Sequence, residues 1–319
     1  MQTYLVTGAA GFIGRSLAAA LLARGNRVRG IDNFATGKRG NLQGLEAMEL
    51  IEGDLNDPKA AAASCAGVDC IFHEAAIPSV PRSVEDPITS NHANVTGTLQ
   101  LLVAAKAAGV RRVIYAGSSS AYGNTPTLPK HEEMTPNPIS PYAVSKLAGE
   151  LYMRSFAQVY GLETVTIRYF NVFGPHQDPA SQYSGVLAKF TMKMLAGETP
   201  TILGDGEQSR DFTYIDNVVH GNLLAASAPA EKVSGRVFNI ATGSRITLNE
   251  TVELLRRLTG YAGPVQYGPE RSGDVKHSLA DISRAREALG YEPLVRFAQG
   301  LERTVAWYKS ARPAAVARG

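Results

Sequence analysis

The sequence predicts an α/β fold, a doubly wound parallel sheet with a smaller α+β domain on its C-terminal side. Three observations support this prediction. Short apolar segments typical of buried strands alternate with helical segments over residues 1–172. A glycine-rich turn joins the first strand to the first helix. Small and polar residues follow several expected strands, at the carboxyl ends where a sheet of this kind binds its ligands.

Composition restricts the classes of partner. The 319 residues carry a formal net charge of +3, with 19% charged and 44% hydrophobic residues, which is ordinary for a globular protein. This charge is too small to favour nucleic acid or a membrane surface, and the longest apolar run, 17–23, is too short to cross a bilayer. Cys65 and Cys70 match no zinc or redox spacing, so we expect reduced core cysteines. A cytoplasmic protein without a metal site is expected.

The first unit of the chain carries a dinucleotide-binding pattern. Residues 2–7 are expected to form a strand and residues 15–24 a helix, with the glycine turn 8–14 between them. Glycines there let the backbone approach a pyrophosphate, which the helix N-terminus then faces. The next strand, 27–31, ends at Asp32, whose carboxylate suits an adenosine ribose and repels a 2′-phosphate. The unit predicts a Rossmann-type site for NAD rather than NADP.

Alternation of strand and helix continues after this unit. Further strands are expected at 48–52, 70–73, 112–116 and 164–169. A helix over about 91–108 precedes the third of these, which runs into a glycine and three serines, Ser118 to Ser120. Because the carboxyl ends of parallel strands meet at one edge of the sheet, the residues that follow them should face the same crevice.

The expected domain division follows the lapse of this alternation. Residues 1–172 should form the NAD-binding domain, and a strand at 236–240 should return to its sheet. Residues 173–235 and 241–308, with glycine, proline and scattered charges, should mainly form the second, substrate-binding domain, and 309–319 a tail.

The candidate catalytic pair is Tyr142 and Lys146, four residues apart. Ser140 is a natural N-cap and Pro141 suits a first helical position, so a helix from Pro141 puts phenol and ammonium on one face. Tyrosine is a poor base at its unperturbed pKa near 10. Lowering that pKa by roughly three units takes about 4 kcal/mol, which positive charge from Lys146 and an oxidised nicotinamide could supply. The alternative is that Tyr142 and Lys146 are a chance pair on a solvated helix face. The glycine turn and the serines argue against this alternative.

The same helix is expected to extend to Tyr160 and carries two apolar stripes. One sheet needs only one apolar face. We therefore expect the second face to pack on a partner helix across a homodimer, through paired helices that include 141–160.

The glycine turn in its GxxGxxG form, Ser118 and the Tyr142/Lys146 pair together resemble the extended short-chain dehydrogenase/reductase family, and the resemblance covers nearly the whole chain. It extends to Asp32-Asn33-Phe34 with Gly37 and Asn41, Tyr169 to Pro175, Ser209 to Phe212, and Arg271 to Asp274. These segments are similar to UDP-sugar 4-epimerases. The greatest likeness is to bacterial UDP-N-acetylglucosamine/UDP-glucose 4-epimerases that also carry Gln177-Asp178-Pro179 and His277 to Asp281.

One residue departs from the pattern. Relatives usually have an apolar residue where this chain has Glu74. We expect this difference to leave the chemistry unchanged.

The resemblance implies a resident NAD and a role for each matching residue. The cofactor would contact Gly8, Gly11, Phe12, Ile13, Gly14, Asp32, Asn33, Gly37, Asp54, Leu55, Ala75, Ala76, Tyr142 and Lys146. Tyr142 would take the proton of the sugar 4-hydroxyl as the C4 hydride leaves. Lys146 would hold the nicotinamide ribose and lower the tyrosine pKa, and Ser118 would help to relay the proton.

The resemblance also implies a UDP-sugar substrate. It would be held by Ser118, Ser119, Ser120, Tyr142, Asn171, Arg210, Arg271, Asp274 and Ser278. The arginines would bind the diphosphate and Asp274 the uridine ribose. Ser278 would leave space beside the sugar C2 substituent. A surface ion pair with Asp211 is the alternative for Arg210, and a loop-capping role is the alternative for Asn171.

The implied activity is 4-epimerisation of UDP-hexoses, both UDP-GlcNAc/UDP-GalNAc and UDP-glucose/UDP-galactose, through a transient 4-keto sugar. A UDP-glucuronate 4-epimerase stays open, because Ser119 and Ser120 could bind a carboxylate, although threonine is usual at Asn171 in those enzymes. Dehydratases and decarboxylases are less favoured, since dehydratase relatives place acidic residues directly after the Ser118 equivalent. A non-catalytic NAD-binding sensor is also less favoured, because such proteins typically lack the Tyr/Lys pair that this chain has.

Overall fold

A seven-stranded parallel sheet organises the molecule, and the computed structural model describes residues 2–178, 185–270 and 276–311. The strand order is β11-β6-β5-β4-β1-β2-β3, the order of a doubly wound nucleotide-binding sheet with one strand added. The strands are β1 Thr3–Thr7, β2 Arg27–Asp32, β3 Glu49–Glu52, β4 Cys70–His73, β5 Arg112–Ser118, β6 Glu163–Tyr169 and β11 Arg236–Ile240. The predicted fold class is confirmed, and the strand expected at 236–240 pairs with β6.

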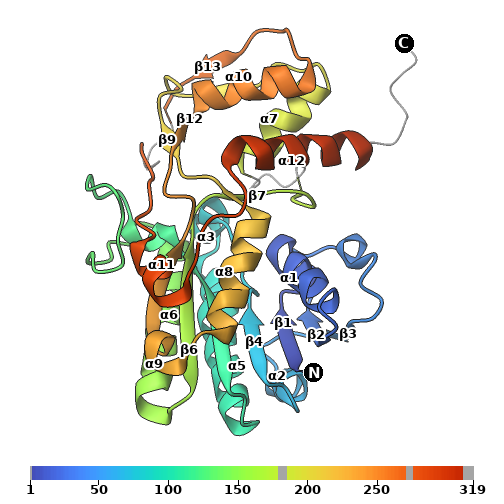
Figure 1. The fold of residues 1–319 in the computed structure, drawn as a ribbon, viewed down its shortest axis with the longest axis vertical. Helices are drawn as coiled ribbons and strands as arrows, with labels where there is room; N and C mark the ends of the chain where they lie inside the picture. The colour runs from blue at the N-terminus through green and yellow to red at the C-terminus, as the bar shows by residue number, and fades with distance from the viewer. Residues whose placement is uncertain (1, 179–184, 271–275, 312–319) are drawn as a thin grey trace.

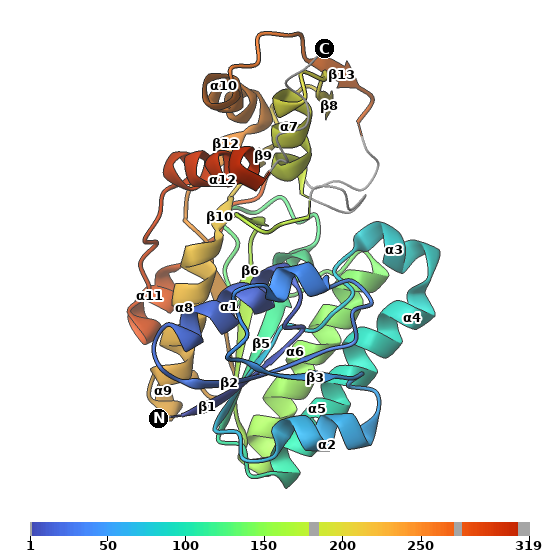
Figure 2. The ribbon, with the colours of Figure 1, turned by 90° about the vertical axis from the view of Figure 1, so that its right-hand side faces the viewer.

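Helices cover both faces of this sheet (Figures 1 and 2). One face carries α1 Phe12–Leu22 and α8 Ile215–Ser227. The other carries α2 Pro58–Cys65, α5 Gly97–Ala107 and α6 Pro141–Tyr160. Successive strand residues point to opposite faces, so Leu5 packs in the core with α5 and its neighbour Val6 in the core with α1. Burial on both faces explains why these strands are apolar without alternation.

The helix expected over about 91–108 is interrupted in the structure. The N-cap of α4 Pro87–Asn91 is Asp86, whose side chain accepts from the Thr89 amide. A π-helical turn, 92–96, joins α4 to α5. Within this turn Asn94 is fully buried and accepts a 2.7 Å bond from the Ile77 amide. Its amide group also donates to Ser145 on α6 at 3.0 Å. These long-range bonds leave no signal in hydrophobic periodicity.

A smaller α+β unit lies beyond the carboxyl ends of the strands (Figures 1 and 2). Its helices are α7 Val186–Leu195, α10 Leu248–Thr259 and α12 Phe297–Ala311. Its short strands pair as β7 Val172–Phe173 with β10 Thr213–Tyr214, β8 Thr201–Leu203 with β13 Gln266–Gly268, and β9 Ser209–Arg210 with β12 Ile246–Thr247. By contrast, α8, α9 Ala230–Val233 and α11 Ser283–Leu289 pack against the large sheet, because β6 and β11 need cover.

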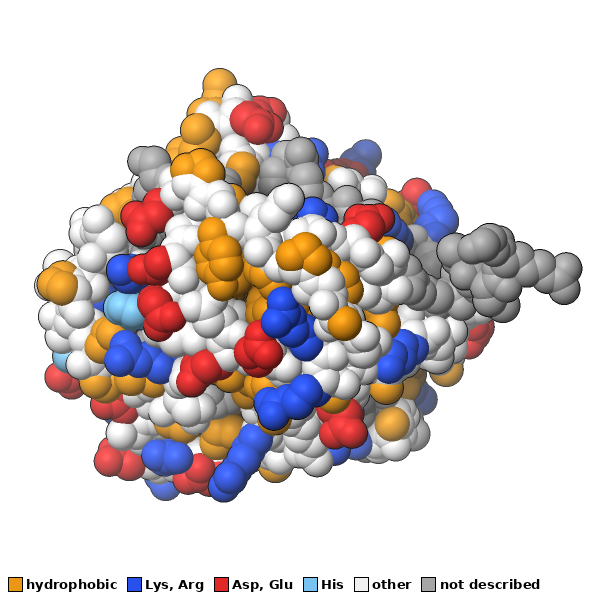
Figure 3. Space-filling view, turned by 90° about the horizontal axis from the view of Figure 1, so that it is seen from above, with side chains coloured by type: hydrophobic (Ala, Val, Ile, Leu, Met, Phe, Trp, Pro, Cys, Tyr) orange, Lys and Arg blue, Asp and Glu red, His pale blue; other side chains and the backbone are white. Residues whose placement is uncertain are grey.

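The remaining elements are short: α3 Val80–Glu85 and the 3₁₀ turns η1 Arg39–Leu42 and η3 Ser119–Tyr122. Across the described ranges, no helix has the length and apolar character needed to span a membrane. Figure 3 views the end of the molecule that carries the smaller unit, where acidic and basic side chains are interspersed. Cys65 and Cys70 are buried and free, as the sequence predicts.

Helix α6 forms as the sequence predicts, but only one of its faces is covered. The Ser140 hydroxyl accepts from the Ala143 amide at 3.1 Å and Pro141 occupies the first turn. Val144, Leu151 and Val159 are 52%, 57% and 67% exposed, because the sheet covers the opposite face of the helix. These apolar side chains are therefore uncovered within one chain, and their burial against a partner helix stays a prediction.

Candidate active site

A cavity of about 650 Å³ opens at the carboxyl edge of the sheet, within the range typical of small-molecule sites. It brings together residues that follow β1, β2, β4, β5 and β6 with the first turn of α6. The predicted residues that line it are Gly8, Gly11, Phe12, Ile13, Gly14, Asp32, Asn33, Asp54, Leu55, Ala75, Ala76, Ser118, Ser119, Tyr142 and Asn171. Most of the predicted cofactor contacts thus share one cavity.

The glycine turn is as tight as a phosphate-binding turn requires. Gly8 has φ +65°, and a Cβ added there would lie 2.9 Å from the Ala75 Cα. A Cβ on Gly14 would lie 2.2 Å from the Gly8 carbonyl oxygen, so the helix packs on the turn only because Gly14 has no side chain. Gly37 plays a related part, since its Cβ would lie 2.9 Å from the Ala10 Cβ. The turn presents the N-terminus of α1 to the cavity, which suits an anion.

Asp32 is held in place at one end of the cavity. Its two carboxylate oxygens accept from the amides of Ala10, at 2.8 Å, and Phe34, at 2.7 Å. An ionised carboxylate has about four acceptor positions, so capacity is left for ribose hydroxyls. Asn33, beside it, donates to Asp54 at 2.8 Å. This end of the cavity fits an adenosine ribose.

Tyr142 and Ser118 line the other end of the cavity, and Lys146 lies one helical turn beyond Tyr142. The phenol and the ammonium project from one face of α6, and Ser118 ends β5. The Ser118 hydroxyl hydrogen-bonds the Tyr142 phenol and accepts from the Ser120 hydroxyl at 2.8 Å. Lys146 is buried, with its ammonium 4.3 Å from the centre of the Tyr115 ring. The base and the proton relay that the resemblance implies, Tyr142 and Ser118, are therefore neighbours, while Lys146 is not among the residues that line the cavity.

Burial is the main influence on the ionisation of this pair. Burial raises the pKa of Tyr142 above its ordinary value, and the hydrogen bond from Ser118 only partly opposes this shift. Burial also lowers the pKa of Lys146 to about 8, while Glu74 opposes that change. In the protein alone, desolvation of the phenolate is therefore the larger effect. The expected lowering of the tyrosine pKa also depends on the charge of an oxidised nicotinamide, and it stays a prediction.

Glu74, Tyr169 and Asn222 form a hydrogen-bonded chain into the cavity that the sequence did not predict. The Tyr169 hydroxyl donates to Glu74 Oε1 at 2.7 Å, and Asn222 donates to the Tyr169 hydroxyl at 2.8 Å. Glu74 and Tyr169 both line the cavity. Burial raises the pKa of Glu74 to about 7. The one sequence signal was an acidic residue directly after a buried strand, at the ligand-binding edge of the sheet.

The predicted substrate residues are only partly assembled. Ser119 lines the cavity from η3, next to Ser120. Asn171 lines it too, while its side chain donates to the Asp211 carbonyl at 3.1 Å. Arg210 donates to the carbonyls of Ser209 and Lys276, both at 3.0 Å. The side chain of Asp211 is buried and accepts from the Thr242, Gly243 and Ala280 amides, so a surface ion pair with Arg210 is wrong.

Ser278 is half-buried, and its amide donates to the Ser209 carbonyl at 3.0 Å, which joins its segment to β9. Arg271 and Asp274, the other predicted contacts for UDP, lie outside the described residues. The UDP contacts therefore remain predictions.

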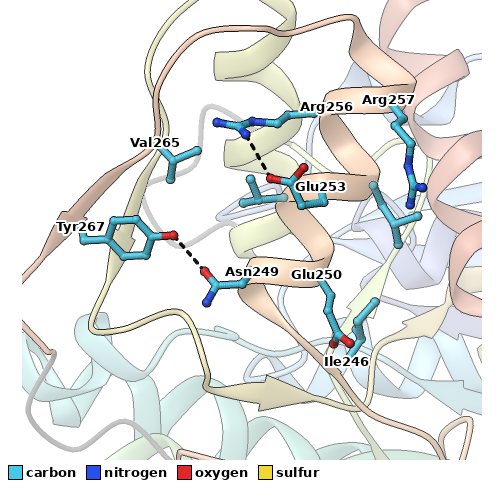
Figure 4. Close-up of a pocket in the computed structure, with 10 residues that line it drawn as sticks. Ile246, Asn249, Glu250, Glu253, Arg256, Arg257, Val265 and Tyr267 are labelled. Atoms are coloured by element: carbon cyan, nitrogen blue, oxygen red, sulfur yellow. Dashed lines mark hydrogen bonds and ion pairs between the residues drawn. The ribbon is translucent and has the colours of Figure 1, made fainter.

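A second pocket lies in the smaller unit, between α10 and β13 (Figure 4). Its volume is also about 650 Å³, so size does not distinguish the two. Its polar groups largely pair with one another: Glu253 with Arg256 at 3.0 Å, and the Tyr267 hydroxyl with Asn249 at 3.0 Å. None of the predicted site residues lines it. The chemistry of the lining therefore favours the cavity at the sheet edge as the candidate active site.

Comparison with known proteins identifies the family of the chain. The model of the NAD dependent epimerase/dehydratase family matches residues 4–241. The UDP-glucose 4-epimerase of Mycolicibacterium smegmatis is 40% identical over 316 residues, which cover 96% of this chain and 98% of that protein.

Two solved structures show the likeness in three dimensions. The UDP-N-acetylglucosamine 4-epimerase of Methanobrevibacter ruminantium, in complex with UDP-N-acetylmuramic acid, is 40% identical with a TM-score of 0.91, over 98% of this chain and 99% of that one. A UDP-glucuronic acid 4-epimerase variant from Bacillus cereus, bound to NAD and a fluorinated UDP-glucuronic acid, is 33% identical with a TM-score of 0.90, over 98% and 100%.

Proposed function

The chain belongs to the NAD dependent epimerase/dehydratase family, and we propose that it is a UDP-sugar 4-epimerase that keeps NAD as a resident cofactor. One observation carries the proposal. A single cavity joins the glycine turn and Asp32 at one end to Ser118 and Tyr142 at the other, with Lys146 one helical turn from Tyr142. Such a cavity can hold a dinucleotide along its length and a sugar hydroxyl beside the phenol.

The described residues fit NAD. The glycine turn leaves no space for a side chain next to the helix N-terminus, and Asp32 is fixed by two backbone amides. When bound, NAD supplies an acceptor for the C4 hydride and returns the hydride to the sugar. The remaining cofactor contacts are those given by the sequence, with Lys146 on the nicotinamide ribose.

Asp32 determines the choice between NAD and NADP. We expect protein purified without added cofactor to release NAD, with little NADP, when it is denatured. A 2′-phosphate would lie against the Asp32 carboxylate, which is buried and already fixed in place. Chromatography of the released nucleotides checks this, and NADP as the main species would contradict the assignment.

The protein's own groups move the proton. Tyr142 takes the proton from the 4-hydroxyl while C4 loses its hydride, so that C4 and its oxygen become a carbonyl. Ser118, hydrogen-bonded to the phenol, relays that proton, and Lys146 supplies nearby positive charge. Return of the hydride to the opposite face of C4, and of the proton to its oxygen, gives the C4 epimer.

The proposed substrate class rests on the resemblance, which puts the small Ser278 beside the sugar C2 substituent. We infer that the enzyme accepts UDP-GlcNAc/UDP-GalNAc as well as UDP-glucose/UDP-galactose. UDP-glucuronate is the second candidate, because Ser119 lines the cavity and the similar Bacillus cereus protein acts on that class.

Incubation of the purified protein with each of these UDP-sugars, without added cofactor, tests the function. Conversion to the C4 epimer is the expected result. Turnover of UDP-glucuronate alone would favour the second candidate. A dehydrated or decarboxylated product, or no turnover, would contradict the proposal.

Domain roles and assembly complete the proposal. Residues 1–172 with 236–240 bind NAD, and residues 173–235 and 241–308 mainly hold the UDP-sugar. The exposed apolar side chains of α6 support a homodimer through this helix, and Ile88 on the neighbouring α4 is also exposed. A monomeric mass in light scattering would contradict that assembly. Two buried free thiols support a reducing, cytoplasmic setting.

A further inference from the structure

Glu74 is placed at the catalytic end of the cavity by the strand order. It directly follows β4, which lies between β1 and β5 in the sheet. Its side chain therefore enters the cavity between the glycine turn after β1 and Ser118 at the end of β5. Asp32 is the last residue of β2, on the far side of β1. The two carboxylates thus occupy different ends of the cofactor cavity.

A chain of hydrogen bonds that begins on α8, behind the cavity wall, holds the Glu74 carboxylate in place. Tyr169 on β6 donates to it at 2.7 Å, and the Tyr169 hydroxyl accepts from Asn222 on α8 at 2.8 Å. Asn222 is fully buried and also donates to the Val218 carbonyl at 2.8 Å. The chain of bonds runs from α8 to the cavity wall. Such support is expected for a charge that must keep its place, and an apolar residue would need none of it.

The charged and titratable groups around Glu74 come from four elements. Lys146 and Tyr142 belong to α6, Tyr115 to β5 and Tyr169 to β6. His73 on β4 is bonded to two threonines, and burial lowers its pKa to about 3, so it is neutral. Burial raises the pKa of Glu74 to about 7, against the hydrogen bond from Tyr169 and the charge of Lys146. The Glu74 charge therefore changes near neutral pH.

We propose that the Glu74 carboxylate sets the charge balance at the nicotinamide end of the cavity and favours the oxidised over the reduced cofactor. This inference rests on the proposed NAD-dependent function. Oxidised nicotinamide carries one positive charge and reduced nicotinamide none, so a fixed carboxylate nearby stabilises only the oxidised form. At an effective dielectric of about 20, one such pair separated by roughly 12 Å is worth about a tenfold difference in affinity, and a closer pair is worth more. A resident cofactor that must end every cycle oxidised benefits from this bias.

Competition between the two cofactor forms tests the proposal. Full-length protein is equilibrated with equal concentrations of NAD⁺ and NADH and separated by rapid gel filtration. The bound forms are then quantified after denaturation, at about pH 8 and about pH 6. We expect Glu74→Gln to lower the bound NAD⁺/NADH ratio about tenfold at the higher pH. In the wild type the ratio should fall as pH drops through 7, because Glu74 becomes neutral, and in the variant it should not change.

Two further variants keep the test falsifiable. Glu74→Leu removes the same charge with an apolar side chain and should give the same low, pH-independent ratio. Asp32→Asn removes a carboxylate from the adenosine end, so it should weaken both forms alike and leave the ratio unchanged. If both Glu74 variants keep the NAD⁺/NADH ratio and the pH dependence of wild type, the role of Glu74 is overturned and the proposed function is not. Wild type that binds neither form would overturn the proposed function with it.

Discussion

Replacement of Tyr142 by phenylalanine should lower kcat by about 10²-fold or more and leave NAD binding nearly intact. The variant keeps the aromatic ring that packs at the start of α6 and loses only the hydroxyl that Ser118 contacts. Removal of a positioned proton acceptor typically costs about two to four orders of magnitude in rate. The measurement is kcat with UDP-galactose, together with the NAD content of the purified variant.

Tyr160→Phe is the matched control for this substitution. It removes a phenol from the other end of the same helix, where the ring is exposed and contacts Lys106. Its kcat should equal that of wild type. Activity of Tyr142→Phe within a few-fold of wild type would remove Tyr142 from the mechanism.

Ser278→Tyr should separate the two substrate classes. Wild type is expected to interconvert UDP-GlcNAc and UDP-GalNAc as well as UDP-glucose and UDP-galactose. A tyrosine beside the sugar C2 substituent should clash with an acetamido group. Overpacking of that kind costs about 1–3 kcal/mol, roughly 5- to 150-fold in kcat/KM, while turnover of UDP-galactose survives.

The comparison is kcat/KM for UDP-GlcNAc and UDP-galactose in both proteins, so that the smaller substrate is the internal control. The hydrogen bond from the Ser278 amide to the Ser209 carbonyl fixes the register of this segment against β9. The substitution therefore changes the side chain at one defined position. Equal loss on both substrates, or a wild type that never accepts UDP-GlcNAc, would show that Ser278 does not set the size limit.

The fold and the cofactor end of the site are predictable because their signals are local. The glycine turn, the strand that ends at Asp32 and the Ser140–Pro141 helix start each occupy a short stretch of chain, and each forms. The bounds of the first helix differ: it runs from Phe12 to Leu22 instead of over 15–24. The strand at 236–240 is also recognisable from its own apolar residues. Local backbone preference and burial agree in all of these segments.

The rest depends on contacts between distant segments. The Glu74 carboxylate is held in place by Tyr169, 95 residues later, which in turn is bonded to Asn222, 53 residues beyond that. The π-helical turn before α5 forms where Asn94 reaches Ile77 and Ser145. The raised pKa of Tyr142 comes from burial, which only the packed site shows. Sequence patterns report none of these effects.

The central claim is that the C4 hydrogen leaves the sugar and returns within the same site. Protein purified without added cofactor should be incubated with UDP-galactose that carries deuterium at C4, and the product analysed by mass spectrometry. We predict UDP-glucose that retains deuterium at C4, since the resident NAD holds the label during the reaction. Loss of the deuterium to water would contradict this account, because it would mean that a base removes the C4 hydrogen as a proton.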